Sequence, residues 1–93
     1  MDKAAGKRVL KAFTPQARRI VNRIDPLDLV KVGASKDEYD GVVAEAARLL
    51  ARDAPDFAPR LEAYIRASYG LSADRARVAK LATELRAAWQ AAR

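Results

Sequence analysis

The acidic residues whose spacing could support chemistry all lie in one short stretch of this sequence. Asp37, Glu38 and Asp40 are the densest group, and Asp25 and Asp28 precede them. A calcium-binding loop needs alternating Asp or Asn ligands, then Gly and a distal Glu, and these acids lack that spacing. Transition-metal sites and general-base catalysis draw mainly on His or Cys, and the sequence contains neither. We therefore expect no metal site, no cofactor and no enzyme.

The first of these acids is expected to end a helix and to organise a turn. Pro26 disfavours the helical conformation at Asp25, so a helix arriving through Ile24 should stop there. The Asp25 carboxylate can then accept hydrogen bonds from the backbone amides that follow it. The next residues are too apolar for a free loop, so we expect a short turn held against the core by Leu27, Leu29, Val30 and Val32.

The later acids are typical of a helix start. Ser35 and Glu38 have the spacing of a capping box, and Asp40 is a second candidate for the N-cap of the following helix. Negative side chains at this place, including Asp37, also favour the positive end of the helix dipole. Tyr39 is expected to be a core aromatic residue with a bonded hydroxyl; the alternative is that it presents the hydroxyl to a partner.

Apolar residues recur at helical spacing through the rest of the chain, and no segment alternates as a strand does. Thr14 followed by Pro15 has the pattern of an N-cap and a first helical position, which predicts a new helix there. Gly70 is expected to end a helix in the left-handed conformation, and Ser72 to cap the last helix. The predicted helices cover residues 3–13, 15–24, 40–52, 59–69 and 73–93.

These elements predict an all-α fold, a compact single-domain bundle of four to five short helices. Ninety-three residues are typical of one domain, so we expect residues 1–93 to form a single unit. Within it, residues 1–14 could be a loosely docked basic helix or arm. The sequence shows neither a long apolar run nor the apolar core of a signal peptide, so we expect a cytoplasmic protein without a membrane segment.

The net charge of +6 is unevenly distributed along the chain. Residues 1–23 carry seven Lys or Arg and one acid, residues 24–58 carry four and eight, and residues 59–93 carry seven and three. An acidic band therefore lies between two basic segments. The basic segments are either solvated faces of an Arg-rich chain or a surface for a polyanion or an acidic protein partner.

The acidic band resembles a known family. Its residues read Asp-Pro-Leu-x-Leu from Asp25 and Gly-Ala-x-x-Asp-Glu-Tyr-Asp from Gly33. This pattern resembles that of small, largely uncharacterised bacterial helical proteins, in which a Phe/Tyr-Gly helix end, here Tyr69-Gly70, lies further on. Members often carry Trp before the Asp-Pro and Gly two residues after the Pro, where this chain has Ile24 and Asp28. The resemblance implies a compact helical domain, and some of these proteins have immunity or partner-binding roles.

Our leading interpretation is therefore a non-enzymatic helical protein-binding module, of an immunity type or a regulatory type. The partner would be another protein, and the oligomeric state stays open. We expect the contact surfaces to be the basic faces of the first and last helices and the following residues of the acidic band: Asp25, Asp28, Asp37, Glu38, Tyr39 and Asp40.

The alternative is a small basic nucleic-acid-binding protein that uses a helix-turn-helix-like pair of helices near its C-terminus. Gly70, Leu71 and Ser72 fit the turn of that motif, whereas Arg66 occupies a position that normally holds a small residue. Outside this alternative, we expect at most a weak association with nucleic acid. The alternative assigns nucleic-acid contacts to the following residues: Arg18, Arg19, Arg23, Arg75, Arg77 and Lys80.

Overall fold

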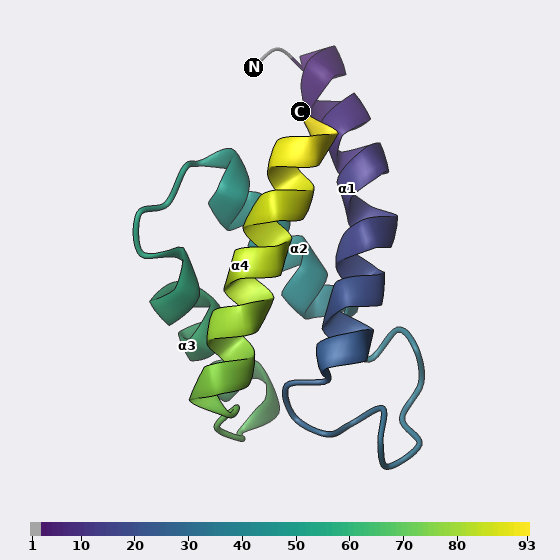
Figure 1. The fold of residues 1–93 in the computed structure, drawn as a ribbon, viewed down its shortest axis with the longest axis vertical. Coiled ribbons are helices and arrows are strands. Elements are labelled where there is room, and N and C mark those ends of the chain that lie inside the picture. Colours follow the sequence, from purple (N-terminus) through teal and green to yellow (C-terminus); the bar gives the residue numbers. More distant parts are fainter. Residues whose placement is uncertain (1–2) are drawn as a thin grey trace.

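Four amphipathic segments of the sequence form four α-helices in the computed structural model, which describes residues 3–93. The helices are α1 (Lys3–Ile24), α2 (Asp40–Ala51), α3 (Phe57–Tyr69) and α4 (Arg75–Ala92) (Figure 1). Residues 3–93 contain no strand, so the predicted all-α bundle is confirmed, with four helices. The bundle measures 39 × 26 × 19 Å along its principal axes.

The helices form a ring in which each one packs against the next in the sequence. α1 contacts α2, α2 contacts α3, α3 contacts α4, and α4 returns to pack along α1. α2 also contacts α4 across the ring. α1 and α4 lie side by side along the longest axis, with the C-terminus near the start of α1 (Figure 1). These two longest helices therefore form the main seam of the bundle.

The helix boundary predicted at Thr14 is wrong. α1 runs without interruption from Lys3 to Ile24 and holds Pro15 in its interior. A proline inside a helix removes a backbone hydrogen bond and costs about 3 kcal/mol. Packing offsets this cost, because the inward stripe continues across the proline at four-residue spacing and is buried: Val9, Phe13, Ala17 and Val21. Residues 3–14 are thus part of the longest helix, while residues 1 and 2 lie outside the described chain.

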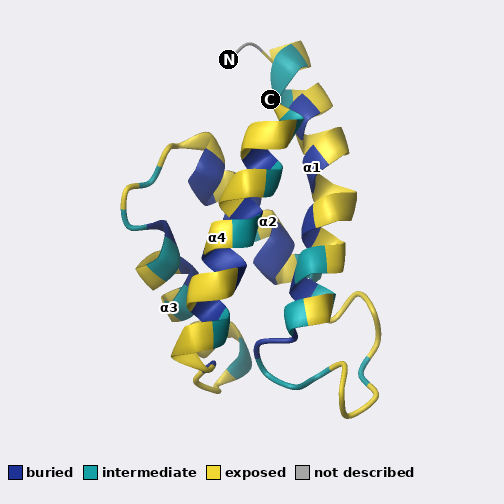
Figure 2. Cartoon of the chain, in the orientation of Figure 1, coloured by how far each residue is buried: buried dark blue, intermediate teal, exposed yellow. Residues whose placement is uncertain are grey.

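The core forms where the four apolar stripes meet. Phe13 of α1 and Trp89 of α4 pack edge to face, with ring centroids 5.1 Å apart and ring planes at 81°. Buried residues lie on the sides of the helices that face one another, and exposed residues lie on their outer sides (Figure 2). The largest of the other fully buried side chains are Tyr39, Phe57, Leu49, Leu61, Ile65, Leu81 and Leu85.

The end of α3 agrees with the sequence prediction, and the start of α4 does not. Gly70 ends α3 with a φ of +69°, and its backbone N–H donates to a carbonyl of the last turn at 2.9 Å. α4 is capped by Asp74 rather than by Ser72. The Asp74 carboxylate accepts hydrogen bonds from the backbone N–H groups of Ala76 at 2.8 Å and Arg77 at 3.2 Å. The stronger acceptor, two residues further on, therefore sets the helix start.

Candidate functional site: an apolar groove between α1 and α2

A groove runs along the surface between α1 and α2, with part of α4 at its back. Its volume is about 540 Å³, and its lining is mainly apolar. The groove exists because small residues occupy positions where larger side chains would fill the space between the helices. The residues on the two facing sides of the groove include Gly6, Leu10 and Thr14 of α1 and Ala44, Ala47 and Ala51 of α2.

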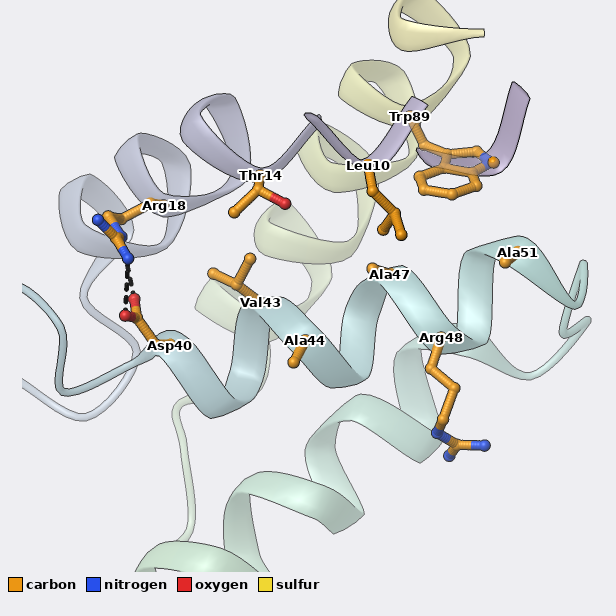
Figure 3. A pocket seen from close by; sticks show the side chains of 11 residues that line it. Leu10, Thr14, Arg18, Asp40, Val43, Ala44, Ala47, Arg48, Ala51 and Trp89 are labelled. Atoms are coloured by element: carbon orange, nitrogen blue, oxygen red, sulfur yellow. Dashed lines mark hydrogen bonds and ion pairs between the residues drawn. The ribbon is translucent and has the colours of Figure 1, made fainter. Parts of the chain in front are cut away.

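Side chains of three helices meet along the groove (Figure 3). Thr14 of α1 lies opposite Val43 of α2, and Leu10 lies opposite Ala47 (Figure 3). The indole of Trp89 lies beside Leu10 and closes the back of the groove (Figure 3). Leu10 is 43% exposed, a large fraction for a leucine beside a core, so its apolar surface is open to a ligand.

An ion pair closes one end of the groove. The Arg18 guanidinium of α1 donates two hydrogen bonds to the Asp40 carboxylate of α2, from Nε at 3.0 Å and from Nη2 at 2.7 Å (Figure 3). This two-point contact fixes the orientation of both groups. It also means that Asp40 is not the side-chain N-cap that the sequence suggested, since the N-cap position of α2 is Tyr39 and has no side-chain bond.

The α2 wall of the groove presents little charge to the space between the helices. Arg48 of α2 contributes to the lining, but its guanidinium turns away from α1 (Figure 3). There it is paired with Glu45 through hydrogen bonds of 2.9 and 2.6 Å. The pair holds the pKa of Glu45 below its ordinary value, because the Arg48 hydrogen bonds outweigh the effect of burial. The α2 side of the groove is therefore a mainly apolar surface formed by Val43 and three alanines.

The acidic band contains a buried polar network centred on Asp25. The Asp25 carboxylate accepts hydrogen bonds from the amides of Val30 at 3.0 Å and Lys31 at 2.9 Å. The Tyr39 hydroxyl donates to the same carboxylate at 2.7 Å and accepts from the Leu27 amide at 3.0 Å. The sequence predicted an Asp25 that binds following amides and a core Tyr39 with a bonded hydroxyl, and both predictions are confirmed.

This network shifts the acidity of both partners. Burial acts to raise the pKa of Asp25, but the hydrogen bonds from the Tyr39 hydroxyl and from the backbone amides outweigh it, so the pKa is lowered. Burial and the neighbouring carboxylate raise the pKa of Tyr39. Tyr39 is 1% exposed and Asp25 is also buried. Both side chains are therefore bonded inside the chain, and their predicted contact with a partner stays a prediction.

The other predicted contact residues are partly or fully exposed but do not share one site. Asp28 pairs with Arg77 of α4 at 2.7 Å, which ties the loop after α1 to the start of α4. The Asp37 carboxylate is bonded to the Ser35 hydroxyl, which lowers the pKa of Asp37. The Glu38 carbonyl accepts a hydrogen bond from a tyrosine hydroxyl of α3 at 2.7 Å. Partner contact by these acids stays a prediction.

The prediction that four apolar residues hold the loop between α1 and α2 to the core is right for two of them and wrong for the other two. Leu27 and Leu29 pack partly against the core, as expected. Val30 and Val32, predicted to hold the turn to the core, are exposed, and Val32 is 77% exposed. The hydrogen bonds to Asp25 hold the turn instead, so the polar side chain carries the role that the sequence assigned to the valines.

The basic residues of the nucleic-acid alternative divide into two groups. Three are engaged within the chain: Arg18 with Asp40, Arg23 with Glu84, and Arg77 with the loop after α1. Arg19 makes a 3.4 Å hydrogen bond to a glutamine of its own helix. Arg75 and Lys80 have no side-chain partner among residues 3–93 and remain exposed. The residues therefore do not form one free basic face.

Sequence reasoning missed the groove itself. Its α1 wall repeats every four residues at Gly6, Leu10, Thr14 and Arg18, a spacing that crosses the helix boundary predicted between Thr14 and Pro15. Its α2 wall repeats as small residues at Ala44, Ala47 and Ala51. The small residues were a detectable signal, but their pairing with α1 depends on packing between distant segments.

The described residues hold no group of three His, Cys, Asp or Glu side chains that could bind a metal ion. None of the helices between residues 3 and 93 has both the length and the apolar character needed to cross a bilayer. When the chain was compared with protein-family models, with curated proteins and with solved structures, none of the three comparisons gave a match.

Proposed function

We propose that this protein is a small non-enzymatic helical module that binds another protein, in a regulatory or immunity-type role. The groove between α1 and α2 is the observation that carries the proposal. Apolar grooves between helices are common binding sites for helical segments, because a ligand's apolar side chains are removed from water there. Part of the Leu10 side chain and the exposed alanines Ala44 and Ala51 of α2 are available for such a contact.

The proposed role is supported by the resemblance of the acidic band to a family in which some members have immunity or partner-binding roles. In this chain the hydrogen bonds to the Asp25 carboxylate hold together residues from the two ends of the loop after α1. The Asp28–Arg77 pair ties the same loop to α4. In our proposal these contacts stiffen the loop that joins the two groove helices, so that α1 and α2 keep the groove preformed. Preformed sites lose less entropy on binding.

Site-specific photo-cross-linking in the host cell tests this proposal. A benzophenone amino acid replaces Ala44, an exposed groove residue, and in a matched control it replaces Ala67, an exposed residue of α3 outside the groove. We expect one protein to be captured from position 44 and not from position 67. That protein is then identified, purified and tested for binding in solution.

The purified pair gives the quantitative test. Ala44→Gln places an amide without a hydrogen-bond partner in the apolar groove, and we expect it to weaken binding by about tenfold or more. Ala67→Gln, the same change outside the groove, should leave the affinity unchanged. Equal capture from both positions, or equal affinities for the two variants, would contradict the proposal.

A further inference from the structure

The charge of α1 has no full explanation within the fold. The helix carries seven Lys or Arg residues and no Asp or Glu. Among residues 3–93, only Arg18 and Arg23 of this set pair with an acid. Its first turn lacks an acid, although negative side chains are the ones that stabilise a helix start. The surplus is therefore concentrated in the N-terminal half of α1.

Three of these cations lie beside residues that line the groove, although none of them belongs to the lining itself. Residues seven apart in a helix share a face, because seven residues make nearly two turns. Lys3 lies seven residues before Leu10, and Lys7 lies seven before Thr14. Lys11 has the same relation to Arg18, which closes the groove. The three lysines are exposed and have no side-chain partner among the described residues.

The lysines also repel one another. Lys3, Lys7 and Lys11 follow at four-residue spacing, and like charges at that spacing destabilise a helix. The only acid in the lining of the groove is Asp40, at the far end, and Arg18 already occupies it. A row of unpaired cations beside an apolar groove is complementary to a ligand that is apolar on one face and negative beside it.

We infer that the groove binds an acidic amphipathic helix of a partner protein; the inference rests on the proposed protein-binding function. The apolar face of that helix enters between Leu10 and the alanine wall of α2, and its carboxylates pair with Lys3, Lys7 and Lys11. Between Gly6 and Arg18, α1 advances by roughly 18 Å, which matches a partner helix of about three turns. The two arginines of the lining, Arg18 and Arg48, are already paired with Asp40 and Glu45, so within residues 3–93 the groove itself presents no unpaired cation to a phosphate.

A synthetic peptide pair tests the ligand chemistry directly. The acidic peptide has about 14 residues, with Leu at i, i+4, i+7 and i+11 and Glu beside them; the basic peptide has Lys in place of every Glu. Trp89 is the single tryptophan of the chain and lines the groove, so its emission reports binding there. We expect the acidic peptide to change Trp89 emission and to shift the amide resonances of Leu10 and Ala47, and the basic peptide to do neither.

Reversing the charge of the three lysines tests whether they bind the acidic peptide. In the triple variant Lys3→Glu, Lys7→Glu and Lys11→Glu, we expect the affinity for the acidic peptide to fall about tenfold or more, and the basic peptide to bind instead. A second triple variant makes the same change in net charge at exposed cations outside the groove, Lys36→Glu, Arg75→Glu and Lys80→Glu. It should change the affinity by less than about twofold, because salt screens distant charges.

Other results would overturn the inference. Absence of binding at about 1 mM peptide, equal binding of the two peptides, or equal effects of the two triple variants would remove the acidic helix as the ligand. Larger shifts of the same groove resonances with anionic phospholipid vesicles or duplex RNA would assign the lysines to those surfaces. Capture of a partner from position 44 that presents a neutral or basic segment would also overturn the inference, while leaving protein binding intact.

Discussion

At the scale of single residues, the Tyr39 hydroxyl joins two parts of the acidic band. It donates to the buried Asp25 carboxylate and accepts from the Leu27 amide. Tyr39→Phe keeps the ring but leaves both groups short of a partner, so we expect the free energy of unfolding to fall by about 1–3 kcal/mol. Urea denaturation measures this. Tyr64→Phe is the control, because the Tyr64 hydroxyl has no hydrogen-bond partner within residues 3–93, and an equal loss there would contradict the assignment.

The lowered pKa of Asp25 predicts how the free energy of unfolding depends on pH. Its pKa in the folded protein is lowered, so the folded state binds the proton less tightly than the unfolded state does. The stabilisation is present above the unfolded value of about 3.9 and is lost as the pH falls through the lowered value. Asp25→Asn should therefore be less stable at neutral pH and show a weaker decline in acid. Unfolding curves from about pH 2 to 7 measure this, and parallel declines would contradict it.

At the scale of the helices, the start of α4 offers a matched test. Asp74→Ala removes the carboxylate that accepts two backbone amides, and we expect a loss of about 0.5–2 kcal/mol. Ser72→Ala, two residues earlier, should stay within about 0.5 kcal/mol of the native protein. Chemical denaturation followed by circular dichroism measures both. A larger loss for Ser72→Ala would restore the cap that the sequence first suggested.

Signals confined to neighbouring residues allowed accurate prediction of several element boundaries. Pro26 marks the end of α1, and Gly70 has the left-handed conformation that ends α3. Pro15 misled for the same reason, because a local rule predicted a boundary where buried residues four positions apart hold one continuous helix. The Arg18–Asp40 ion pair could not be predicted from neighbouring residues either, since its partners lie 22 residues apart. Local propensity describes single turns, and packing decides which turns join.

At the scale of the whole molecule, the seam between α1 and α4 should dominate stability. Phe13 and Trp89 meet there edge to face, and both are buried. Trp89→Ala removes the largest side chain of the seam, and we expect a loss of about 3–5 kcal/mol. Thermal and urea unfolding followed by circular dichroism measure the change. A nearly neutral result would show that the seam does not hold α1 in place.

The fold class was predictable from the sequence, whereas the candidate site was not. Helical spacing is a property of each segment, so a bundle of four to five helices could be predicted before their arrangement was known. The groove is a property of two helices together, and its small residues acquire meaning only once Leu10 lies opposite Ala47. The lysine row was visible as charge, but its place beside the groove depends on how α1 packs against α2.

We propose that this chain recognises a protein through its groove and not nucleic acid through its basic faces. The most direct measurement compares affinities at about 150 mM salt, for the partner captured from position 44 and for labelled duplex DNA and RNA. The native protein is compared with the double variant Arg75→Glu and Lys80→Glu, whose altered residues lie outside the groove.

We predict that the partner binds both proteins equally and changes Trp89 emission. Nucleic acid should bind weakly and be released as salt rises from about 50 to 200 mM, since a +6 chain attracts polyanions without recognising them. Sub-micromolar binding of DNA or RNA at about 150 mM salt, abolished by the double variant and without a change at Trp89, would contradict the account.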